Sequence, residues 1–170
     1  MIEKILKTDN FDWGALIARV FLGVVILPHG LQKLLGMFGG YGFSATVEYF
    51  ASTGIPSLIG VLIVMGESFG ALFLILGLIS RVSAAGIALI MLGATVMVHS
   101  QFGFFMNWFG TQGGEGFEYH LLALGLALVV LVKGGGKWAL DGEIFKMFSQ
   151  SQLFQSSGKT LLSFQYGGEG

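Results

Sequence analysis

Long apolar stretches that carry almost no charge constrain this chain more than any other feature. Four such stretches are found along its 170 residues, and only 11% of the residues are charged. A typical soluble domain has about 25% charged residues, and it could not bury four such stretches in its core. A helix needs about 17–25 mostly apolar residues to cross the hydrocarbon core of a bilayer. The sequence therefore predicts an integral membrane protein.

The apolar stretches are continuous and do not alternate with polar residues, which favours transmembrane helices over the strands of a barrel. We therefore expect an all-α protein in which residues 1–142 form a membrane-embedded four-helix bundle. Residues 143–170 are expected to form an amphipathic, interfacial helix followed by a flexible tail. The predicted spans cover residues 13–35, 56–79, 82–101 and 117–133.

The connections on the two sides of the predicted bundle differ in character. In the first outer loop, Phe43, Val47 and Phe50 recur at helical spacing before Gly54 and Pro56, which predicts a short amphipathic helix on the membrane surface. The second outer loop is rich in aromatic residues, which is typical of a membrane-interface belt or of a lid. Basic residues mark the opposite side, where Lys4, Lys7, Arg81, Lys133, Lys137 and Lys146 contrast with Lys33 alone on the outer side. The positive-inside rule then predicts that both termini are cytoplasmic.

Charge and cysteine content exclude several classes of function. The net charge of −1 argues against a nucleic-acid-binding protein, which needs a concentrated basic surface. The chain has no cysteine, so it cannot form disulfides, thiolate metal sites or iron–sulfur ligation. Any electron carrier must then be a bound small molecule or belong to a partner protein.

A few ionisable residues interrupt the predicted spans, and such residues by default mark a function or an ion pair because burying them costs free energy. The alternating direction of the helices places five of them in the outer half of the bundle. Structural alternatives remain open: Arg19 and Glu67 could form a buried ion pair, Glu118 could cap a helix, and His99 or His120 could be interfacial. The five that are expected to converge are His29, Lys33, Glu67, His99 and Glu118.

Several short motifs in a fixed order resemble the DoxX family of small bacterial membrane proteins. The matching stretches are Arg19-Val-Phe-Leu-Gly23, Pro28-His-Gly-Leu-Gln-Lys33, Gly54-Ile-Pro56, Gly66-Glu67, Leu76-Gly-Leu-Ile-Ser-Arg81, Gly116-Phe-Glu118, Gly134–Gly136 and Leu140-Asp141. Gly135 departs from the family, which often has proline there. The resemblance implies a four-helix protein of the bacterial inner membrane with a role tied to redox chemistry. Its relatives include a membrane subunit of a thiosulfate:quinone oxidoreductase and a member of a complex that counters oxidative stress.

Two functions follow from the residues and the resemblance together. The first is a redox-associated membrane subunit with a pocket for a quinone or a small redox substrate. In that case His29, Glu67 and Glu118 would carry proton transfer, and His29, Lys33 and His99 would bind the head group. The alternative is a non-catalytic structural or assembly subunit of a larger membrane complex. Either reading implies contacts with membrane lipid and with other membrane protein subunits. A haem or metal site would be formed by His29, His99 and either His120 or a carboxylate, and no ligand spacing in the sequence supports one.

Overall fold

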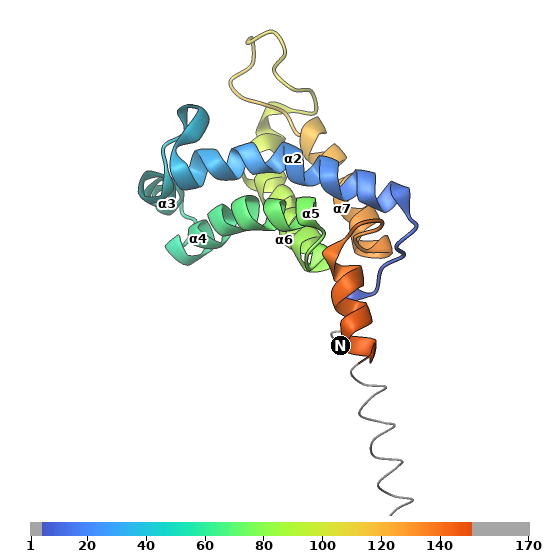
Figure 1. Cartoon of the computed structure of the whole chain (residues 1–170). Helices are drawn as coiled ribbons and strands as arrows, with labels where there is room; N and C mark the ends of the chain where they lie inside the picture. The colour runs from blue at the N-terminus through green and yellow to red at the C-terminus, as the bar shows by residue number, and fades with distance from the viewer. Residues whose placement is uncertain (1–4, 151–170) are drawn as a thin grey trace, which may run out of the picture.

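The structure is a computed structural model that describes residues 5–150 (Figure 1). This part of the chain has no strand and confirms the predicted all-α class. Its helices are α2 (Trp13–Leu35), α3 (Phe43–Ser52), α4 (Ser57–Met65), α5 (Ala71–Leu76), α6 (Ser80–Ala94) and α7 (Glu118–Lys133), with the short helical segments η1 (Met37–Gly39), η2 (Gly66–Gly70), η3 (Thr95–His99) and η4 (Ser100–Phe102). A further helix begins at residue 140 and continues to residue 150.

Three helical segments are long and apolar enough to cross a membrane, namely Trp13–Leu35, Ser57–Leu76 and Ser80–Phe102. They correspond to the first three predicted spans. The second ends three residues earlier than predicted, because Gly77 and Ile79 adopt left-handed backbone conformations that turn the chain into α6. Helix α7 has 16 residues and is about 24 Å long. It is shorter than a hydrocarbon core of about 30 Å, so its crossing of the membrane stays a prediction.

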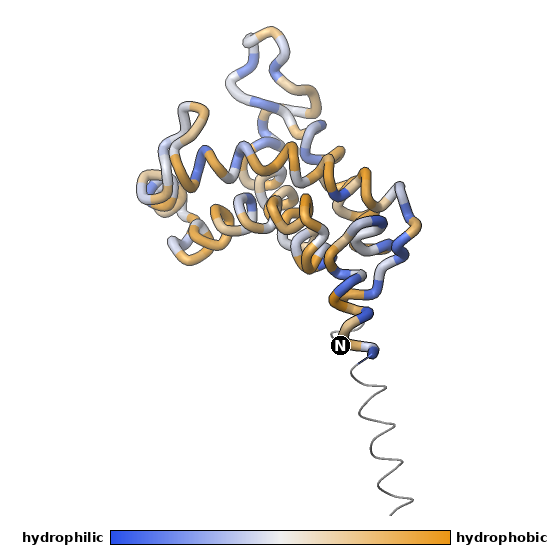
Figure 2. Tube along the Cα trace, viewed as in Figure 1, coloured by the Kyte–Doolittle hydropathy of each residue, from blue (hydrophilic) through white to orange (hydrophobic). Residues whose placement is uncertain are grey.

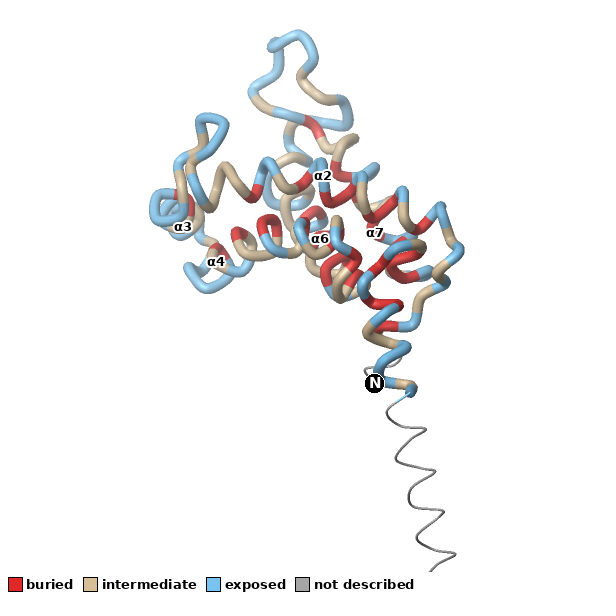
Figure 3. The backbone as a smooth tube through the Cα atoms, in the orientation of Figure 1, coloured by how far each residue is buried: buried red, intermediate tan, exposed pale blue. Residues whose placement is uncertain are grey.

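The helices pack around one apolar core, as predicted for a four-helix bundle. Many core residues are alanine, which allows close approach of helices in a membrane. Figure 3 shows that buried residues gather where α6 and α7 meet α2, whereas α3 and the loop of residues 103–117 are mostly exposed. Hydrophobic residues also cover much of the outer surface (Figure 2). The core residues are Ala18, Leu22, Ile26, Ala71, Leu74, Ala84, Ile87, Ala88, Met91, Ala123, Ala127 and Val130.

Arg19 joins three segments at one end of the bundle. Its side chain is 2% exposed and donates hydrogen bonds to the backbone oxygens of Leu74 (2.8 Å) and Ile75 (2.6 Å) at the end of α5. It also donates to Gly135 O (2.6 Å) and Lys137 O (3.1 Å). A cation at the carboxyl end of a helix also complements the helix dipole. The alternative of an Arg19–Glu67 ion pair is therefore wrong, because Arg19 binds carbonyl groups at the other end of α5.

Asp141 closes the same end of the bundle from the chain segment that follows α7. It is 1% exposed, and its two carboxylate oxygens accept hydrogen bonds from Ile79 N (2.6 Å) and Ser80 N (2.8 Å). Ile79 is the residue before α6 and Ser80 is its first residue, and amides at the start of a helix have no partner within it. Asp141 thus caps α6 and holds the helix of residues 140–150 against the bundle.

The opposite end of the bundle carries the two longer loops. Helix α3 confirms the short helix predicted for the first outer loop, and it packs on α4, where Phe50 lies against Gly60. The loop of residues 103–117 extends away from the bundle (Figure 1), and Trp108 and Phe109 in it are 78% and 90% exposed. The helix predicted at the start of residues 143–170 is found over residues 140–150. Residues 151–170, with the predicted flexible tail, lie outside the described residues.

Candidate functional site

Glu67 lies in a π-helical turn, η2, in the middle of the continuous helix formed by α4 and α5. Turns of this kind are rare and are frequently found at functional sites. The Glu67 side chain is 6% exposed, and its Oε2 atom is 2.6 Å from Lys33 Nζ on α2. Gly30 allows this approach, because a Cβ atom there would lie 2.5 Å from the backbone of Glu67. The absence of a side chain at Gly30 therefore lets α2 bring Lys33 to Glu67.

His29 precedes Lys33 by one helical turn and lies on the exposed surface of α2. The ring centroid of His29 is 6.1 Å from that of Tyr119 on α7. His29 therefore lies between the ion pair and the first turn of α7, and it can be reached from outside the bundle.

His99 and His120 form a second group of polar side chains, on the other side of Tyr119 from His29. Their ring centroids are 4.1 Å apart, and His99 Nδ1 is 2.8 Å from the backbone oxygen of Glu115. A carbonyl only accepts, so this contact requires a proton on His99 Nδ1. His120 is 6% exposed. His99 lies in η3, which is the second π-helical turn of the structure.

Two buried polar atoms in the first turn of α7 have no hydrogen-bond partner: the Tyr119 hydroxyl and His120 Nδ1. The rings of the two residues are 5.4 Å apart. Buried polar groups are nearly always hydrogen-bonded, and an exception calls for an explanation. A bound small molecule with oxygen atoms would supply the missing partners.

We call these residues the polar row, and they run from α2 and η2 across the start of α7 to η3. The row consists of Lys33, Glu67, His29, Tyr119, His120 and His99. It can offer a carboxylate, an ammonium group, three imidazoles and a phenol to one ligand or to a chain of proton transfers. No group of three or more His, Asp or Glu side chains within residues 5–150 is arranged to hold a metal ion.

Four of the five residues expected to converge are in the polar row, whereas Glu118 is directed elsewhere. Its Oε1 atom accepts hydrogen bonds from Met106 N and from Trp108 Nε1, both at 3.1 Å, and its backbone amide donates to Phe104 O. Glu118 thus anchors the aromatic loop to the first turn of α7. The Glu118 carboxylate therefore lies against the loop of residues 103–117 and not beside Glu67.

Sequence reasoning missed Tyr119 and gave His120 no part in the site. The helical phase of α7 contained the signal, because His120 is about 200° from Glu118 around the helix. It therefore projects towards the bundle when Glu118 projects towards the loop. Tyr119 carried no comparable signal, since an aromatic residue near the end of a span is typical of a membrane interface.

Comparison with known proteins places the chain in a family. The sequence model of the DoxX family matches residues 14–100. The chain is 31% identical to "Putative oxidoreductase CatD" of Bacillus subtilis over 137 residues, which cover 81% of this chain and 91% of that protein.

Two further relatives are from Escherichia coli. Inner membrane protein YphA is 28% identical, with 77% of this chain and 94% of that protein covered. Inner membrane protein YqjF is 25% identical, with 76% and 91% covered. No solved structure matches the chain significantly. Together with the apolar spanning helices, these matches show that the chain is a multi-pass inner membrane protein and that it belongs to the DoxX family.

Proposed function

We propose that this protein is a redox-associated membrane subunit that binds a quinone, or a small redox substrate of similar chemistry, at the polar row. The observation that carries the proposal is the pair of buried, unpartnered polar atoms on Tyr119 and His120. They lie in the segment that links His29 to His99. The name of the Bacillus subtilis relative, "Putative oxidoreductase CatD", agrees with a redox role.

The polar row suits the needs of quinone reduction. Tyr119 and His120 can hydrogen-bond the two carbonyl-type oxygens of a head group. His29 is exposed on α2, so a substrate dissolved in the bilayer can reach the row from the side. The Glu67 carboxyl group is 2.6 Å from the Lys33 ammonium group, and Lys33 lies one helical turn from His29. Glu67 can therefore exchange protons with a bound substrate.

Reduction of a quinone to a quinol takes two electrons and two protons. The chain has no cysteine, so it supplies no thiol or iron–sulfur centre to carry the electrons. We assign the electrons to a redox centre of a partner protein and the protons to the residues of the polar row. His29 and Glu67 are the residues through which the protons would reach the two oxygens.

Tryptophan fluorescence can test the site directly. The chain has three tryptophans, and Trp108 alone lies at the polar-row end, hydrogen-bonded to Glu118. In a Trp13→Phe/Trp138→Phe background, titration with decylubiquinone in detergent should quench Trp108 saturably. His120→Phe and His29→Ala should each weaken the apparent affinity about tenfold or more. In membranes, His29→Ala and Glu67→Gln should abolish quinone-linked turnover.

A matched control is Lys146→Gln, because Lys146 is paired with Glu143 at the other end of the protein. It should leave the quenching unchanged. Equal quenching curves in the parent and in both histidine variants would refute the site assignment. Absence of saturable quenching together with stable co-purification of other membrane proteins would instead favour an assembly subunit. The exposed aromatic residues of the 103–117 loop, such as Phe109, are the observation that favours this second candidate.

A further inference from the structure

A second feature lies at the opposite end of the bundle from the polar row. An open groove of about 310 Å³ runs between the start of α2 and the end of α7. Its walls are apolar and include Ile17 and Ala18 on α2 and Leu126 and Val129 on α7. Ile17 and Val129 are 53% and 38% exposed. The small residues on α2 leave the space, and the exposed apolar side chains open it towards the surrounding medium.

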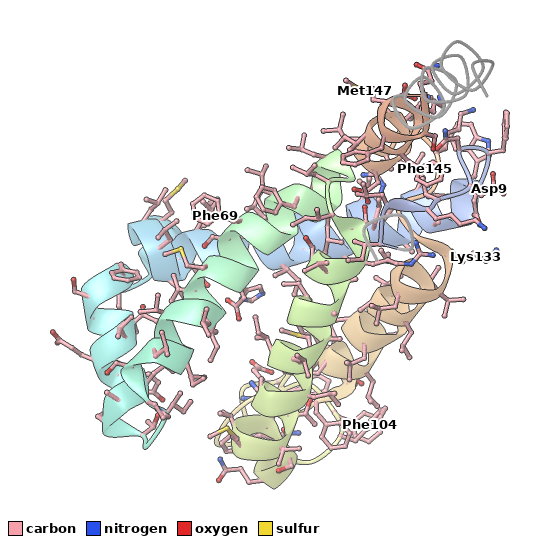
Figure 4. All side chains as sticks on the ribbon, turned by 90° about the horizontal axis from the view of Figure 1, so that it is seen from below. Asp9, Phe69, Phe104, Lys133, Phe145 and Met147 are labelled. Atoms are coloured by element: carbon pink, nitrogen blue, oxygen red, sulfur yellow. The ribbon has the colours of Figure 1, made fainter. Side chains whose placement is uncertain are left out.

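Charged and aromatic groups stand at one end of this groove. Asp12 and Lys133 line it, and Lys133 Nζ is 2.9 Å from Asp12 Oδ2. Lys137 is fixed beside them, because its backbone amide donates to Asp12 O at 3.0 Å. Figure 4 shows Lys133 near the end of α7, on the same side of the molecule as Asp9. The apolar groove therefore ends at a polar rim.

Two exposed tryptophans mark this rim. The Lys137 ammonium lies 4.0 Å from the ring centroid of Trp13 and 5.3 Å from that of Trp138, and the two indoles pack edge to face at 5.3 Å. Trp138 adopts a φ of 57°, a conformation that is unfavourable for a bulky residue. This conformation holds an exposed indole against Trp13. Paired tryptophans with a lysine are typical of the level of lipid head groups.

The rim carries an excess of positive charge. Arg81 and Lys7 adjoin Lys133, since the Arg81 guanidinium donates to the Lys7 carbonyl and to Val132 O at the end of α7. Among the described residues at this rim, the basic side chains of Lys7, Arg81, Lys133 and Lys137 outnumber the acidic ones of Asp9 and Asp12. Basic residues at a membrane surface attract anionic lipids in preference to zwitterionic ones.

We propose that this groove is a binding site for an anionic phospholipid. One acyl chain lies between Ile17 and Val129, and the phosphate contacts the ammonium groups of Lys137 and Lys133. The proposal does not depend on the proposed redox function, because the residues involved are all at the other end of the bundle. It commits to a lipid because the apolar groove and the basic rim are continuous, so one molecule with a tail and an anionic head fits both.

The purified full chain in mild detergent can test this site. Native mass spectrometry and thermal unfolding should be measured with phosphatidylglycerol, with phosphatidylcholine of the same acyl chains, and with glycerol 3-phosphate. We expect phosphatidylglycerol to bind at least tenfold more tightly than phosphatidylcholine and to raise the unfolding temperature. Glycerol 3-phosphate should do neither, because it has no acyl chain to occupy the groove.

Two variants test the contact with the acyl chain and the contact with the phosphate separately. Ile17→Trp fills the groove and should weaken binding of both phospholipids, whereas Lys137→Gln should remove the preference for phosphatidylglycerol. The matched controls are Phe21→Trp, at an exposed position of α2 outside the groove, and Lys146→Gln. Equal affinity for the two phospholipids, equal effects of glycerol 3-phosphate, or unchanged binding in Ile17→Trp would each overturn the proposal. If Ile17→Trp does not fold, Lys137→Gln still decides the head-group contact.

Discussion

The buried side chain of Arg19 gives the sharpest prediction for stability. We consider its replacement by methionine, which keeps an unbranched apolar stem and removes every hydrogen-bond donor. The change deletes four bonds to backbone carbonyls of α5 and of the segment after α7. These bonds hold α2, the end of α5 and the Gly134–Gly136 turn together, so their loss should loosen the whole end of the bundle.

The size of the effect follows from the number and burial of these bonds. A hydrogen bond from a charged donor contributes about 1.5–3 kcal/mol, but bonds made by one group are not additive. The carbonyl of Leu74 also keeps a second partner, the amide of Gly77. We therefore expect Arg19→Met to lower the free energy of unfolding by about 3–5 kcal/mol, as for other broken buried polar contacts. This corresponds to a fall of roughly 10 °C in the unfolding temperature.

Thermal unfolding in detergent measures this change, and Arg81 offers a matched control. Arg81 also donates to three backbone carbonyls, two at the end of α7 and one at Lys7, but it is only partly buried. Water can replace its bonds, so Arg81→Met should cost only about 1 kcal/mol. Arg19→Lys should lower the free energy of unfolding by an intermediate amount, because an ammonium group cannot make all the hydrogen bonds of the planar guanidinium group. An unfolding temperature of Arg19→Met within about 2 °C of the parent protein would refute this reasoning.

Two further predictions concern the other charged pairs. Glu67→Gln should lower the free energy of unfolding by about 1–3 kcal/mol, because it leaves the Lys33 ammonium group without its carboxylate, and the double variant with Lys33→Met should recover part of this loss in thermal unfolding. At the other end, the amide of Ala15 and then the ammonium group of Lys133 lower the pKa of Asp12. The stability that Asp12 contributes is therefore complete above the pKa of an unfolded aspartate, about 3.9, and is lost as the pH falls through the lower folded-state pKa. Unfolding temperatures measured from pH 5 down to pH 2.5 should fall less in Asp12→Asn than in the parent protein, and parallel curves would contradict this assignment.

The sequence determined the class of this protein and most of its helices, because apolar length and charge distribution act locally. A stretch such as Trp13–Leu35 is long enough to span a bilayer whatever it packs against. The helix in the first outer loop was also predictable, since its apolar spacing and the following Gly54 and Pro56 are local signals. The approach of His29, Lys33, Glu67 and His99 was expected as well, because helix direction and depth follow from the order of the spans.

The partners of the buried charges could be decided only by the tertiary structure. Arg19 and Glu67 differ little in predicted depth, yet the first binds carbonyl groups at the end of α5 and the second binds Lys33. Which partner is chosen depends on helix rotation and on the close approach at Gly30, which sequence spacing does not specify. The same holds for α7, where packing directs Glu118 to the loop and His120 to His99. Helix length and depth follow from one segment at a time, whereas a buried contact depends on two surfaces that meet only in the folded bundle.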